Sequence, residues 1–262
     1  MGGIFDYPDI PMSIATGLIF AGIVAIGILF AHRFLQARAH DDSARNGIVE
    51  ISLTVFSGVY GILLGLLVVG TYDNSNAVSD VVMKEADAIS GLYLTSESFP
   101  EPAREEVLRN LRGYTRQVAE HSFTEQARGV RPENETRFIH DIARTLNSFV
   151  PNAKNEEALQ NQAMREFDDL QEARHSRLNN FDIGIPGALW WIVGLGAAIN
   201  LLLICLLEFP LKLHLAFGCL LAFFIGATIF VIASMDTPFS GRDRVAPGPI
   251  QRLLDVAETM PQ

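Results

Sequence analysis

The sequence predicts an all-α membrane protein with four transmembrane helices and a helical-bundle extramembrane domain inserted between the second and third spans. Mean hydropathy is +0.23 with only 19% charged residues, which is unusual for a water-soluble chain of 262 residues. The apolar residues are concentrated in uncharged runs, each long enough to cross a bilayer core of about 30 Å. These runs cover residues 10–31, 51–72, 183–207 and 215–235.

The charged residues are concentrated in one segment. Residues 73–182 hold 20 of the 30 acidic and 13 of the 20 basic residues, and their net charge of −7 is most of the total of −10. We therefore divide the chain into a first transmembrane helix pair (1–72), an extramembrane helical bundle (73–182), a second transmembrane helix pair (183–235) and a tail that packs on the bundle (236–262).

The second span passes directly into the polar segment. Beyond Tyr72 the apolar residues recur every three or four positions up to Tyr93, which is the spacing of an amphipathic helix. We expect a single helix that leaves the membrane and continues into the bundle. Three further amphipathic helices are predicted: one from near Pro102, one over 138–149 and one from about Glu156. A short helix is predicted over 249–258.

The second span has two contrasting faces. Helical spacing places Thr54, Gly58, Gly61, Gly65 and Val68 on one face, which is nearly bare backbone. It places the large residues Phe56, Tyr60, Leu63 and Leu67 on the opposite face. Two interpretations remain open: the glycines make a close helix–helix contact, or the span borders a pore in which the large residues form a constriction that gates by dewetting.

The sequence shows no arrangement of polar residues that is typical of a catalytic or metal site. The six histidines and the carboxylates lack the spacing of metal ligands, and the sequence has no glycine-rich phosphate loop and no nucleophile elbow. We expect no enzyme, no cofactor, no metal and no nucleic-acid partner. Asp80, Glu85 and Asp87 are interpreted as a solvated helix face. Asn200, in the middle of the third span, is expected to face protein or water and not lipid.

Four short stretches resemble a known family. They are GVYGILLGLLVVGTYDN at the end of the second span, EADAISGLY after it, ALWW in the third span and MDTPFSG after the fourth. Over about residues 51–262 the chain resembles the bestrophin-like family, a bacterial group of unknown function, and more distantly the bestrophins. Bestrophins are pentameric ion channels whose second spans line a hydrophobic neck and whose termini and helical domain lie in the cytoplasm.

The resemblance implies a homo-oligomeric ion channel, a pentamer by analogy, with a pore lined by the second span. It also implies that Asp236, Pro238 and Phe239 fix the tail to the bundle, with Gly241 allowing a turn beyond them. The acidic calcium clasp of animal bestrophins has no counterpart beyond Asp236 and Asp243, so we do not expect gating by calcium. The alternative from another class is a non-catalytic structural or accessory subunit whose acidic bundle binds a partner protein.

The membrane orientation follows from two opposing sets of basic residues. Arginines in the loop between the first two spans favour a cytoplasmic loop, whereas basic residues near the other membrane face favour a cytoplasmic bundle. We adopt the second orientation, in the bacterial inner membrane, because the resemblance supports it.

Overall fold

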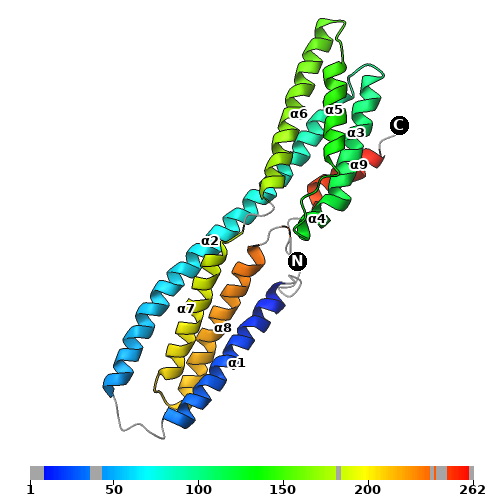
Figure 1. The fold of residues 1–262 in the computed structure, drawn as a ribbon. Helices are drawn as coiled ribbons and strands as arrows, with labels where there is room; N and C mark the ends of the chain where they lie inside the picture. Colours follow the sequence, from blue (N-terminus) through cyan, green and yellow to red (C-terminus); the bar gives the residue numbers. More distant parts are fainter. Residues whose placement is uncertain (1–8, 36–42, 181–183, 237–238, 240–246, 260–262) are drawn as a thin grey trace. The chain divides into compact units, whose positions relative to one another are not determined.

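The computed structural model describes residues 9–35, 43–180, 184–236, 239 and 247–259, which are helical almost throughout and contain no strand (Figure 1). The predicted fold class is therefore confirmed. The helices, in chain order, are α1 (Asp9–Leu35), α2 (Ser43–Ser96), α3 (Ala103–Gln117), the π-helix η2 (Val118–Ser122), α4 (Phe123–Ala127), α5 (Thr136–Ser148), α6 (Lys154–Asn180), α7 (Gly187–Leu206), α8 (Leu211–Met235) and α9 (Gly248–Thr259).

Contacts divide the chain into two units. The membrane unit lies within residues 1–73 and 184–236, and the extramembrane unit lies within 74–183 and 237–262. Helix α2 contributes its first part to the membrane unit and its second part to the extramembrane unit. It has 54 residues without an interruption, so the prediction that one helix continues beyond the span is confirmed.

Four helices of the structure are long and apolar enough to cross a membrane. They contain spans of 24 residues in α1, 51 in α2, 20 in α7 and 25 in α8. Helices α7 and α8 form a hairpin, and each begins directly after a proline, Pro186 and Pro210. Proline suits this position because the first turn of a helix does not need its missing N–H.

Helices α1 and α8 pack closely through reciprocal glycines. A Cβ added at Gly17 would lie 2.7 Å from the ring of Phe223, and one added at Gly226 would lie 2.8 Å from the ring of Phe20. Each glycine thus accommodates the aromatic ring of the other helix. Close approach of this kind stabilises helix pairs in lipid, where packing replaces the hydrophobic effect as the driving force.

The extramembrane unit has one apolar core. Amphipathic faces of α2, α3, α5, α6 and α9 meet in it, and Leu92, Leu111, Ile142 and Leu170 are fully buried there. Helices α3, α5 and α6 agree with the three amphipathic helices predicted in the polar segment. The segment η2–α4 was not predicted, because its apolar residues continue the period of α3 up to Val118 and then shift with the wider turn of the π-helix.

Candidate functional site

The membrane part of α2 has one side that faces its own protomer. Tyr60 is 6% exposed and Leu64 is 5% exposed, and both pack against buried residues of α7 and α8. The Tyr60 hydroxyl donates a hydrogen bond of 2.9 Å to the carbonyl oxygen of Val193 on α7. This side of α2 is therefore occupied within a single copy of the chain.

A polar contact inside the span reinforces this packing. The Ser57 hydroxyl on α2 donates to the Oδ1 atom of Asn200 on α7 at 2.6 Å, and the Asn200 amide donates to the carbonyl oxygen of Gly196 at 2.8 Å. Asn200 is 1% exposed, which confirms that it faces protein. The side-chain amide of Asn200 is therefore hydrogen-bonded inside the span, where a polar group without a hydrogen bond would cost on the order of several kcal/mol of stability.

The rest of the α2 surface in the span is open. The apolar side chains on it are half exposed or more: Val55, Phe56, Val59, Ile62, Leu66 and Val69. A Cβ added at Gly58, Gly61 or Gly65 would meet no atom within 4 Å. Within the described part of one chain, these glycines therefore make no close helix contact, unlike Gly17 and Gly226.

The four large residues predicted to border a pore fall in different environments. Phe56 is exposed, Tyr60 is buried against α7, and Leu63 and Leu67 are half-buried beside the same cluster. The spacing of these residues places them on one stripe, but that stripe borders the side of α2 that packs on α7. Sequence periodicity shows which residues share one face of a helix, but it does not show which neighbouring helix that face contacts.

The described residues of the predicted tail anchor, Asp236 and Phe239, lie in different units. Asp236 is half-buried and accepts hydrogen bonds from the backbone N–H of Ile185 and from Nε1 of Trp190, at 2.9 Å for the latter. Trp190 lies in the first turn of α7 and Ile185 directly before the helix, so Asp236 joins the end of α8 to the start of α7 within the membrane unit. Phe239 is 2% exposed in the extramembrane core, with its ring centroid 5.8 Å from that of Phe123. Pro238 and Gly241 lie outside the described residues.

A buried ionic network crosses the extramembrane unit. Arg177 of α6 is fully buried and donates to Oε2 of Glu85 on α2 at 2.6 Å, to Oε2 of Glu135 at 2.9 Å and to Oε1 of Gln126 at 2.9 Å. Glu135 also accepts a bond of 2.9 Å from Nε of Arg174. Two carboxylates therefore face two guanidinium groups, and the network is balanced in charge.

Two hydroxyl groups complete the network. The Tyr114 hydroxyl of α3 donates to Oε1 of Glu85, and Ser122 Oγ of η2 donates to Oε2 of Glu135 at 2.7 Å. Burial raises the pKa of Tyr114 well above its ordinary value, and the negative charge of Glu85 raises it further. Burial alone would lower the pKa of Arg177, but Glu85 and Glu135 raise it, so the guanidinium stays charged.

The solvated-face interpretation of Asp80, Glu85 and Asp87 is wrong for Glu85. Asp80 and Asp87 are exposed, whereas Glu85 is fully buried and paired with Arg177. The two partners are 92 residues apart, so the local pattern around Glu85 carries no sign of the pair. The network joins side chains of α2, α3, η2 and α6 to Glu135, which lies directly before α5.

Comparisons with known proteins identify the fold family. The Bestrophin-like domain family matches residues 18–250, which is most of the chain. The chain belongs to the bestrophin-like family. The resemblance found in the sequence is thereby confirmed, and the four apolar helices of this family member make it an integral membrane protein.

Solved structures with low sequence identity share the fold. A crystal structure of a bacterial bestrophin homologue from Klebsiella pneumoniae with a single substitution has a TM-score of 0.63 at 10% identity, covering 95% of this chain and 97% of that one. Another substituted form of it has a TM-score of 0.62 at 13% identity, covering 93% and 97%. A crystal structure described as a membrane protein has a TM-score of 0.63 at 14% identity, covering 96% and 100%. No curated protein sequence matches the chain.

Proposed function

We propose that this bestrophin-like protein is a homo-oligomeric ion channel in which copies of α2 surround a central passage. The observation that carries the proposal is the open side of α2. Its uncharged part over residues 51–72 is long enough to span, with one stripe packed on α7 and α8 and the remaining surface exposed. Family membership supports the same function, and a pentamer follows by analogy with the bestrophins.

The side chains around α2 suit a ring. At about 100° per residue, Val55, Ile62 and Leu66 lie opposite the stripe that packs on α7. In a ring with α2 innermost, this stripe points to the axis. Ile62 and Leu66 are 67% and 69% exposed in the protomer. We propose that they form a hydrophobic neck, which can close by dewetting without any charged group.

The two flanks of this stripe differ in shape. Gly58, Gly61 and Gly65 lie on one flank, where the backbone is bare, and Phe56, Leu63 and Leu67 lie on the other. We propose that the glycine flank of one copy receives the large side chains of the next. Contacts between two different surfaces of identical subunits generate closed rings when the rotation closes. The three glycines and three of the four large residues singled out in the sequence then lie at interfaces between copies, whereas Tyr60 stays packed on α7 of its own copy.

A second candidate function is a structural or accessory subunit that binds a partner protein. A groove of about 410 Å³ between α2 and α6 favours it, because its wall carries Asp87, Glu166, Asp169 and Glu172 against one basic residue, Lys84. A basic partner surface would fit this charge. In either function we propose that the extramembrane unit lies on the cytoplasmic side of the bacterial inner membrane.

Electron cryomicroscopy of the purified full-length protein tests the proposal. The expected result is a symmetric ring with α2 closest to the axis and a continuous axial passage. A monomer or dimer with α2 in contact with lipid would contradict it. Isolation of the native protein in a complex with a different chain would favour the accessory function.

A further inference from the structure

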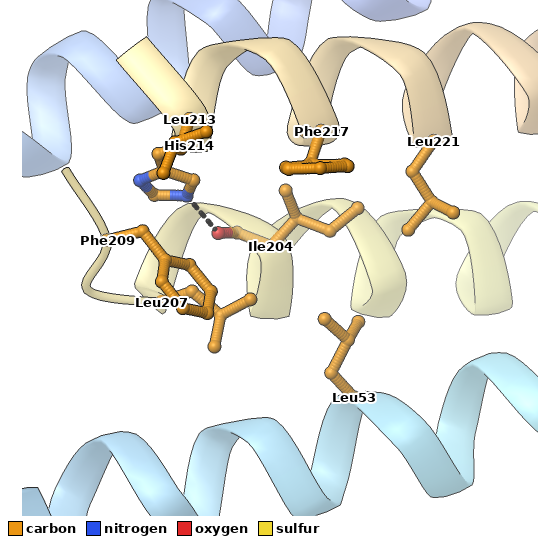
Figure 2. Close-up of a pocket in the computed structure, with 9 residues that line it drawn as sticks. Leu53, Ile204, Leu207, Phe209, Leu213, His214, Phe217 and Leu221 are labelled. Carbon is orange, nitrogen blue, oxygen red and sulfur yellow. Dashed lines mark hydrogen bonds between the residues drawn. The ribbon is translucent and has the colours of Figure 1, made fainter. Parts of the chain in front are cut away.

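The membrane unit contains an apolar pocket at the α7–α8 hairpin (Figure 2). Its volume is about 310 Å³, which is at the lower end of the range of ligand pockets. The side chains that converge on it come from α2, the end of α7, the turn between α7 and α8, and α8. The lining residues are Leu53, Ile204, Leu207, Phe209, Leu213, His214, Phe217, Gly218 and Leu221.

The wall of the pocket is almost entirely apolar. His214 is its one polar side chain, and this residue is 5% exposed with Nε2 2.8 Å from the carbonyl oxygen of Ile204. That contact, drawn as a dashed line in Figure 2, occupies the ring nitrogen on the side of α7. A polar ligand would lose its hydration without gaining hydrogen bonds, and apolar cavities of this kind do not hold water stably.

The surroundings of the pocket identify the occupant. Its walls belong to membrane-spanning helices, and Leu213, Phe217 and Leu221 of α8 are 53%, 68% and 38% exposed. The open side therefore presents exposed apolar side chains within a span, where lipid hydrocarbon is the solvent. These residues are on α8, whereas the open surface at which we propose that copies meet is on α2, so a neighbouring copy is not required to cover the pocket.

One end of the pocket is marked by polar groups. The Asn46 side chain accepts a bond of 2.9 Å from the Glu208 backbone N–H and donates one of 3.3 Å to the Glu208 carbonyl oxygen. These bonds join the start of α2 to the turn, and exposed Lys212 follows in the first turn of α8. Charged and amide groups of this kind lie at the headgroup level of a bilayer.

We propose that this pocket binds one acyl chain of a bilayer phospholipid whose headgroup lies at the level of the α7–α8 turn. The chain passes along Phe209 and Phe217 and ends against Leu53 and Ile204. It fills space between α2 and the hairpin that the protein leaves open, and it thereby supports the position of α2. The site is independent of conduction, because a lipid can bind whether or not ions pass.

Photocrosslinking of the full-length protein in phosphatidylglycerol vesicles tests the site. The probe is phosphatidylglycerol with a diazirine on one acyl chain, and the adducts are located by mass spectrometry of peptides. We expect adducts concentrated on the lining residues of α7, α8 and the turn. Leu53→Trp and Leu221→Trp should each lower these adducts several-fold, because the indole fills the pocket from either side.

Leu220→Trp is the matched control, because Leu220 is a leucine on α8 that is 65% exposed and outside the pocket wall. It should leave the adducts unchanged, and thermal unfolding shows whether each variant is folded. Equal adduct yields in Leu221→Trp and Leu220→Trp would overturn the proposal. Adducts spread evenly over exposed residues of α1 would also overturn it, and an assembled protein without adducts at the pocket would assign the pocket to a second copy.

Discussion

Arg177 is the largest side chain that is fully buried in the described part of the chain. Its guanidinium pairs with Glu85 and, together with Arg174, with Glu135, and these pairs offset the cost of burying the two carboxylates. A buried pair contributes little net stability compared with an apolar replacement of the whole cluster. Loss of one partner is different, because it leaves a charge that is buried and unpaired.

Arg177→Met therefore leaves Glu85 buried without the guanidinium that neutralises it, whereas Glu135 keeps its pair with Arg174. We expect the free energy of unfolding to fall by about 3–5 kcal/mol. Denaturant unfolding of the purified protein in detergent, followed by circular dichroism, measures the change. Arg144→Met is the control, because that side chain is 74% exposed and its pair with Asp141 is worth less than about 1 kcal/mol. An equal effect of both substitutions would show that the network is not stabilised through Arg177.

Tyr114 gives the extramembrane unit a dependence on alkaline pH. Its pKa is raised in the folded state by burial and by Glu85, so folding favours the protonated hydroxyl. The stability that depends on this proton is present below the unfolded pKa of about 10 and is lost as the pH rises above it. The wild type should lose more thermal stability above that pH than Tyr114→Phe does. An equal fall in melting temperature with pH in both proteins would show that Tyr114 is not the source of this pH dependence.

At the scale of elements, much of the fold could be predicted from the sequence. Span length and hydropathy located the four membrane helices, because a bilayer imposes a minimum apolar length. Apolar residues at three-to-four spacing located α3, α5 and α6. Periodicity also placed Phe56 and Tyr60 on one stripe of α2. It could not show that Tyr60 packs on Val193, because the rotation of a helix depends on partners that are distant in sequence.

The packing glycines illustrate the same limit. Gly17 and Gly58 both lie in runs of small residues at helical spacing. The structure places the ring of Phe223 against Gly17, whereas the space beside Gly58 is open. The pair of Glu85 with Arg177 was missed for a similar reason, because burial of a charge depends on its tertiary partner. Local sequence therefore located the elements and not the contacts between them.

Gly61→Leu and Gly65→Leu test the proposed contact between copies. Neither side chain would clash within the protomer, and leucine has a higher helix propensity than glycine, so folding should be retained. We expect the assembly to dissociate into smaller species, as measured by native mass spectrometry. Gly22→Leu in α1 is the control, because a Cβ there also meets nothing within 4 Å. Unchanged assembly of both α2 variants would exclude this glycine flank as an interface.

At the scale of the whole molecule, the charge distribution predicts ion preference. The proposed apolar neck would contribute no charge, and α2 leads from the span into a segment with a net charge of −7. Such a segment enriches cations within a Debye length of about 8 Å at physiological salt. We expect a weak preference for potassium over chloride. Reversal potentials under a potassium chloride gradient measure it, and a clear chloride preference would show that the acids lie away from the ion path.

The most direct test of the account is the current carried by purified protein in planar bilayers. If α2 lines a passage closed by a dry neck, the wild type should give unitary currents, and Ile62→Ser should increase the open time because a hydroxyl favours wetting of the neck. Leu220→Ser, at an exposed position of α8, should behave as the wild type. The absence of current from the wild type and from Ile62→Ser, in protein that forms intact oligomers, would contradict the channel function.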